Sequence, residues 1–173
     1  MAYCVVRTDN LAGTDVRSML ESVKYMGSGS TEAAIANGSV VKIAGLIADA
    51  TTGEPVEYEV MKGVTPAANT SLDEVVLIAD PEVMYDERKK SLDQFINEAG
   101  EVVRGYHLHT GDIFSITAEG FANASPAVGQ IVELAASTKW NNVASATNGS
   151  TVVGKIIDKN IVGRYTYYAI RVD

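Results

Sequence analysis

The fold class follows from the stretch GSVVKIA at residues 38–44 and its near-copy GQIVELA at residues 129–135. Each begins with a glycine, which suits a turn, and continues with alternating apolar and polar residues, which suit a strand with one wet face. GDIFSITA at residues 111–118 is a looser third copy. The pattern indicates a β-rich chain. Two similar β units explain the repetition, and so does independent convergence on an ordinary strand pattern.

Further strand patterns lie on both sides of these stretches. Residues 56–61 alternate apolar and acidic side chains, which predicts a half-buried strand, and the apolar run 75–79 predicts a strand buried on both faces. Residues 19–26 fit a helix or a strand, and we favour a strand. We also expect strands at residues 3–7, 103–109, 113–118, 130–135, 152–157 and 165–172. Many short strands separated by glycine turns predict a mainly β fold made of small β-barrel or sandwich units.

Residues 80–100 differ from the rest of the chain. Asp80 suits a helix cap, Pro81 suits the first helical position, and Gly100 suits a helix end. The sequence therefore predicts either one short helix or a long structured loop around residues 81–99. We expect a single compact unit over residues 1–173, or two packed sub-units of about 1–79 and 101–173 joined by residues 80–100.

The composition limits the classes of function. The chain has 173 residues, 46% of them hydrophobic, and a net charge of −8, which repels phosphate backbones and argues against a nucleic-acid partner. A single cysteine excludes an intramolecular disulfide and fits synthesis in a reducing cytoplasm. We expect no signal peptide and no membrane span, because the apolar runs are far shorter than the roughly 20 residues that a spanning helix needs.

The sequence offers little chemistry, and we expect no enzyme, no catalytic residue, no metal site and no cofactor. His107 and His109 are two residues apart on an expected strand and could face one ion, but zinc requires three or four ligands. We favour two polar side chains on an exposed face over a metal-dependent hydrolase. Cys4 is expected to be a small buried hydrophobe. Nucleophile elbows and phosphate-binding loops are missing from the sequence.

Three stretches resemble a group of structural proteins from tailed bacteriophages of Gram-positive hosts. They are YCVVRTDNLAGT at residues 3–14, PEVMYDERKK at 81–90 and GRYTYY at 163–168. The resemblance implies a capsid decoration (cement) or head-associated protein on the virion surface, made in the host cytoplasm. It implies the major capsid protein as partner, with the chain itself a homo-oligomer. A tail-tube or other tail structural protein is the alternative.

Partner contacts are expected at three places. An edge strand can join a neighbouring sheet, which makes Tyr3, Val5 and Arg7 the first candidates. The only basic run, Arg88-Lys89-Lys90, is the second, although a solvated face explains it equally well. Tyr165 and Tyr167 share one face of the last strand and combine apolar area with a polar tip, so an interface role competes with a plain central strand.

Overall fold

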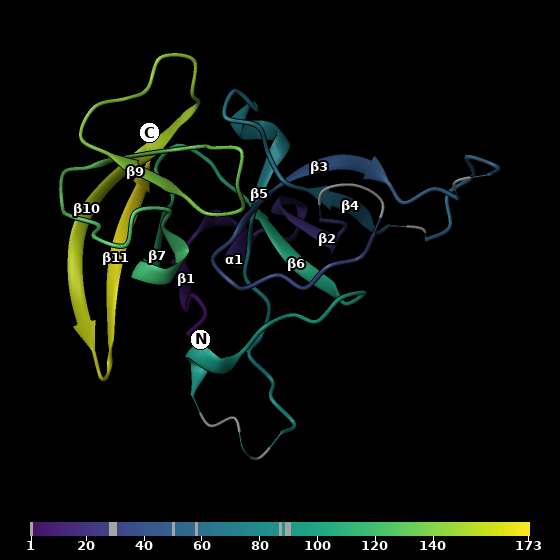
Figure 1. Ribbon diagram of the computed structural model, residues 1–173, viewed down its shortest axis with the longest axis horizontal. Coiled ribbons are helices and arrows are strands. Elements are labelled where there is room, and N and C mark those ends of the chain that lie inside the picture. The colour runs from purple at the N-terminus through teal and green to yellow at the C-terminus, as the bar shows by residue number, and fades with distance from the viewer. Residues whose placement is uncertain (1, 28–30, 50, 58, 87, 89–90) are drawn as a thin grey trace.

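The computed structural model describes residues 2–27, 31–49, 51–57, 59–86, 88 and 91–173 (Figure 1). The fold is mainly β, as predicted, with two sheets, one of which closes into a barrel. The strands are β1 (Val6–Asn10), β2 (Leu20–Tyr25), β3 (Val40–Leu46), β4 (Met61–Val64), β5 (Val75–Ile78), β6 (Val102–His107), β7 (Ile113–Thr117), β8 (Ile131–Glu133), β9 (Asn141–Val143), β10 (Val152–Val162) and β11 (Tyr165–Val172). The one α-helix among the described residues is α1 (Ala12–Asp15), and none of their helices has the length and apolar character to cross a membrane.

Five strands close into a barrel in the order β2-β4-β3-β5-β6, with β6 pairing back to β2. β2 and β4 run parallel, and the other pairs are antiparallel. β-branched aliphatic side chains fill this narrow interior. Gly105 is part of the reason that the barrel closes, because a Cβ there would lie 2.6 Å from a methyl carbon of Val76. The buried interior residues are Val23, Ile35, Val41, Val76, Ile78 and Val103.

The other sheet has six strands in the order β1-β7-β11-β10-β8-β9, all of them antiparallel. β1 and β9 are its edges, and the β10–β11 hairpin is its longest pair. Phe114, Ile156 and Ile170 are fully or almost fully buried on one face, where Phe114 lies 5.3 Å from the ring of Trp140. The sheet thus buries one face and leaves parts of the other to solvent.

The barrel and the sheet share one hydrophobic core. Val40 and Leu77 from the barrel belong to the same buried cluster as Phe114 and Ile170 from the sheet. Two hydrogen bonds also join them: Trp140 Nε1 donates to the carbonyl of Gly38 at 2.7 Å, and the Val40 N–H donates to the carbonyl of Thr138 at 2.9 Å. The barrel and the sheet therefore pack as neighbours on a common interior.

The chain divides between the sheets differently from the sub-unit boundaries expected from the sequence. Residues 80–100 connect β5 to β6, which are neighbours in the barrel, so this segment does not link one sheet to the other. The first strand, β1, belongs to the six-stranded sheet. Among the described residues of the segment the helical part is one 3₁₀ turn, Leu92–Gln94, so the long structured loop is the alternative that the structure supports.

The three glycine turns of the sequence repeat share one backbone pattern. In each, the fourth residue donates its N–H to the carbonyl of the first, and the glycine at the third position has a positive φ, as a type II turn requires. In each turn the glycine N–H donates to the carbonyl of one residue distant in sequence. The N–H of that same distant residue donates to the carbonyl of the residue that follows the glycine. The turns are residues 36–39 with Ile78, 109–112 with Val172, and 127–130 with Ile156.

The strand predicted at residues 56–61 is wrong. β4 begins only at Met61, and the Val56 side chain is 57% exposed. Glu59 has a φ of 64°, a left-handed conformation that interrupts an extended chain. The preceding residues instead form an arm, in which the Val56 N–H donates to the carbonyl of Ile47 at 2.9 Å.

Candidate interaction surface

The loop between β5 and β6, which we call the 80–100 loop, is fastened at its base by two buried asparagines. Asn37 donates from its side chain to the carbonyl of Asp80 at 2.7 Å and accepts from the Asp80 N–H at 3.0 Å. Asn97 donates to the carbonyl of Ile35 at 2.9 Å and to the side-chain oxygen of Asn37 at 3.1 Å. Because both amides are 1% exposed, these bonds fix the ends of the loop in a dry environment.

Asp80 adds a third fastening at the loop base. Its carboxylate accepts the N–H of Arg104 at 3.1 Å, across the start of β6. Partial burial raises the pKa of Asp80, and the bond and the charge of Arg104 oppose that rise. The base of the loop is therefore built from the barrel itself, and its outer part starts from a fixed position.

The outer part of the loop exposes apolar side chains. Tyr85 is 93% exposed and Val83 is 57% exposed, which makes Tyr85 the most exposed of the large hydrophobic residues described. Arg88 is also exposed and pairs with Asp86 at 2.9 Å. Lys89 and Lys90, the rest of the predicted basic contact, lie outside the described residues. Figure 1 shows the described residues 81–86 of the loop projecting away from both sheets.

The returning part of the loop brings two of the predicted contact residues together at Asp93. The backbone N–H of Tyr3 donates to the Asp93 carbonyl at 2.8 Å, and the Tyr165 hydroxyl donates to its carboxylate at 3.1 Å. Arg164 pairs with the same carboxylate at 3.3 Å and lies over the Tyr165 ring at 5.3 Å. A hydrogen bond from Ser91 lowers the pKa of Asp93, with burial opposing and with Tyr165 and Arg164 assisting. Asp93 thus stays ionised and holds the turn of the β10–β11 hairpin, at Arg164 and Tyr165, against the 80–100 loop.

The remaining predicted contacts separate into surface and core. Arg7 is exposed, pairs with Asp9 at 2.8 Å and lies over the Tyr167 ring at 5.6 Å. Tyr167 itself is 6% exposed, and burial raises the pKa of its hydroxyl. Val5 is 2% exposed. The burial of Val5 and Tyr167 argues against direct contact of either side chain with a partner, whereas Tyr3, Arg7 and Tyr165 retain accessible surface.

The two histidines pair with different carboxylates. His107 Nε2 lies 3.4 Å from Glu21, and His109 Nδ1 lies 3.9 Å from Asp112. Asp112 is already used by the backbone, because it accepts from the N–H groups of Ala12 and His109, each at 2.9 Å. Within the described ranges, no three His, Cys, Asp or Glu side chains gather where they could hold a metal ion.

Cys4 is buried, as predicted. It is 5% exposed and packs against the glycine turn at Gly38, where a Cβ would overlap its sulfur. Burial raises the pKa of the Cys4 thiol to about 12, so the thiol stays protonated and unreactive at neutral pH.

A groove between the barrel and the sheet opens beside the N-terminal segment. Its walls carry Tyr3, Tyr25, Ile35 and Phe121, together with several alanines. The lining of the groove is more apolar than polar. Tyr3 links the groove to the 80–100 loop, because its backbone N–H donates to the carbonyl of Asp93. It adds a recessed apolar surface to the projecting one at Tyr85.

The sequence interpretation missed Val83 and Tyr85 as contact candidates. A signal was present: the apolar run VMY at residues 83–85 stands among charged residues within residues 81–90. Asp93 carried no such signal, because its role depends on Tyr3 and Tyr165, which the fold alone brings near it.

Comparisons with protein-family models, with curated proteins and with solved structures find no match to this chain. The function of the chain is therefore inferred from its own surfaces. The most distinctive of these is an anchored loop whose outer part presents an aromatic side chain to solvent.

Proposed function

We propose that this chain is a structural protein of a bacteriophage virion, which decorates and stabilises the capsid by binding the shell of major capsid protein. The observation that carries the proposal is the exposure of Tyr85 and Val83 on a loop with a fixed base. A buried aromatic anchor contributes much of the energy of many protein interfaces, and an anchored loop loses little entropy when it binds.

The location of this loop in the sequence supports the same proposal. Val83, Tyr85 and Arg88 all lie within residues 81–90, one of the stretches that resemble phage structural proteins. The loop offers an apolar anchor beside charged groups, which is a common composition for a contact with another protein. A shell presents many identical sites, so weak contacts of this kind add up when the bound protein is oligomeric.

The first test is whether the chain is part of purified particles. We expect it to sediment with intact particles at a stoichiometry near that of the shell protein, with immunogold labels on the head. Particles that lack it should lose resistance to heat or low salt, because binding to the mature shell stabilises that state. Absence from purified particles contradicts the proposal, and labels on the tail favour a tail structural protein instead.

The second test concerns the loop. Replacing Val83 and Tyr85 together by serine is expected to weaken binding to particles stripped of the chain at least tenfold, which corresponds to about 1.4 kcal/mol. Val128→Ser is the matched control, because Val128 is 56% exposed but lies outside the loop. Binding by sedimentation and folding by circular dichroism would be measured for both variants. Equal binding by both would exclude the loop as the contact.

A further inference from the structure

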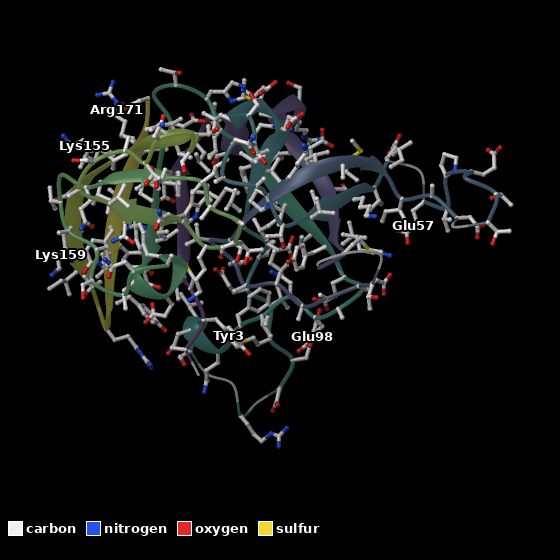
Figure 2. All side chains as sticks on the ribbon, turned by 45° about the horizontal axis from the view of Figure 1, so that its top comes forward. Tyr3, Glu57, Glu98, Lys155, Lys159 and Arg171 are labelled. Atoms are coloured by element: carbon white, nitrogen blue, oxygen red, sulfur yellow. The ribbon has the colours of Figure 1, made fainter. Side chains whose placement is uncertain are left out.

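Charge is divided between the two ends of the molecule. Residues 46–60 contain four acidic residues and no lysine or arginine, whereas residues 152–172 contain four basic residues and one acidic residue. The first segment includes the arm, which begins at the last residue of β3, and the second is the β10–β11 hairpin with its turn. Figure 2 shows Lys155, Lys159 and Arg171 toward one end of the long axis and Glu57 on the opposite side, at the base of the arm that projects there. The two charged regions of one chain are therefore too far apart to pair with each other.

The basic end has a built surface. Lys155 and Arg171 are directly paired across β10 and β11, so their exposed side chains stand on the same face. Beyond Ile156 a bulge turns β10, and Ile157 and Ile161 are 44% and 69% exposed. Of the twelve exposed large hydrophobic residues that the structure describes, four lie on this one strand.

The outer half of β10 also has an unpaired edge. β8 pairs with β10 only as far as Lys155, so in the described part of the chain residues 158–162 pair with β11 alone. An unpaired strand edge offers backbone donors and acceptors to another chain. The hairpin therefore combines positive charge, exposed apolar side chains and a free edge.

The acidic end complements the charge and the exposed apolar side chains of the hairpin. The arm, residues 46–49 and 51–57, is a narrow hairpin in which Ala48 and Pro55 form a bridge and the Asp49 N–H donates to the Glu54 carbonyl at 2.9 Å. Leu46 and Val56 on it are 44% and 57% exposed. Glu54 and, just beyond the arm, Glu59 are exposed to solvent.

The arm is held at its base by the barrel. Lys24 in β2 is 8% exposed and pairs with Glu57, and it lies 3.5 Å from Glu32. A nearly buried ammonium group with two carboxylate partners fixes the direction in which the arm leaves the barrel. The arm thus extends from the molecule in a defined direction, with its acidic and apolar side chains exposed.

We propose that two copies of this chain associate head to tail, with the acidic arm of one copy seated on the β10–β11 hairpin of the next. The partner is a second copy because the two surfaces complement each other in charge and in exposed apolar area. Since the two surfaces lie at opposite ends, each copy in a pair keeps one of its two surfaces free, and the contact is heterologous: it closes into a ring or continues as a filament. Exposed ion pairs are individually weak and screened by salt, so this association depends on ionic strength.

The test is the mass of the full chain in solution, measured by light scattering and sedimentation velocity. We expect oligomers in about 50 mM salt that dissociate in about 500 mM salt, as screening of exposed charges requires. A hairpin variant, Lys155→Glu with Arg171→Glu, and an arm variant, Glu54→Lys with Glu59→Lys, should each be monomeric in low salt. Mixed in equal amounts, the two variants should associate again, because the reversed charges restore complementarity.

Arg17→Glu is the control, because it reverses a charge outside both surfaces and should leave the oligomer intact. A wild-type chain that stays monomeric in low salt at about 100 μM overturns the proposal, and so does a mixture of the two variants that fails to associate. The result is separable from the capsid proposal. The capsid proposal is tested by replacing Val83 and Tyr85, which lie on neither of the two charged surfaces. A monomeric hairpin variant that still binds particles would therefore leave the capsid proposal uncontradicted.

Discussion

Glu133, at the end of β8, is a carboxylate with no exposed surface. One oxygen accepts from the side-chain amide of Asn141 and the other from the Thr147 N–H, each at 2.8 Å. Burial alone would raise the pKa of Glu133, but the bonds from Thr147 and Asn141 outweigh it and lower the pKa below its usual value. Glu133 therefore holds β9 and the loop before β10 in place as an anion.

This residue predicts a particular dependence of stability on pH. A carboxyl with a lower pKa in the folded than in the unfolded chain stabilises the fold above its unfolded pKa of about 4.3, and this contribution is lost as the pH falls through the folded value. We expect Glu133→Gln to reduce the free energy of unfolding by about 1.5–3 kcal/mol at pH 7, the usual contribution of hydrogen bonds to a charged group. Urea titrations at pH 7 and pH 3 would measure the difference in free energy of unfolding between the wild type and Glu133→Gln. An equal difference at both pH values would contradict the conclusion that Glu133 stabilises the fold as an anion.

At the scale of the element, the repeated glycine turns allow a matched comparison. Gly38 and Gly111 occupy the same position of the same turn, with φ values of 76° and 97°. A Cβ at Gly111 would meet open space, whereas a Cβ at Gly38 would overlap the sulfur of Cys4. The two positions therefore share the conformational requirement and differ only in packing.

We expect Gly111→Ala to cost about 1–2 kcal/mol, the penalty for an L-residue in the left-handed region. Gly38→Ala adds overpacking of about 1–3 kcal/mol to the same penalty. Urea unfolding of both variants against the wild type would give the two costs. If Gly111→Ala proved the more damaging, overpacking against Cys4 could not add to the cost at Gly38. If Gly111→Ala cost nothing, the left-handed conformation could not be the reason for glycine in these turns.

Elements with strong local signals were predictable from the sequence. The apolar run at residues 75–79 is the fully buried β5, and the alternation at residues 165–172 is β11. β9 escaped prediction because Asn141 and Asn142 have low strand propensity, and their side chains are used in bonds to Glu133 and Gln130 instead. The strand at residues 56–61 was predicted wrongly because alternation cannot register the left-handed conformation of Glu59.

The candidate surface was only partly predictable, for a similar reason. Arg7 and Arg88 are charged and lie on the surface, as their residue types suggest. Val5 and Tyr167 are apolar or aromatic residues whose exposure depends on what packs over them, and that is decided by residues far away in sequence. Strand periodicity specifies which face a residue occupies, and it does not specify whether another element covers that face.

At the scale of the whole molecule, Trp140 connects the two sheets. Its ring is fully buried against Phe114, and its indole N–H donates to the Gly38 carbonyl in the turn before β3. Trp140→Phe keeps an aromatic ring but removes the donor and leaves a void. We expect a loss of about 2–4 kcal/mol, from the unpaired carbonyl and the cavity together.

Because the core is shared, we expect both the wild-type chain and Trp140→Phe to unfold in a single transition. Urea unfolding followed by far-ultraviolet circular dichroism would record the number of transitions and the loss of stability. Two separated transitions in the wild type would show that the barrel and the sheet are independent, and a loss below about 0.5 kcal/mol would show that Trp140 does not couple them.

The place of β1 at the edge of the six-stranded sheet has a consequence for the order in which the chain folds during synthesis. β1 is made before every barrel strand, yet its pairing strand is β7, which comes about a hundred residues later, after the whole barrel. Every barrel strand has left the ribosome once His107 has emerged, so the barrel can close while residues 6–10 still lack a partner. Residues 6–10 are thus translated before every barrel strand but can pair only after all of them, and this long-range pairing slows completion of the fold.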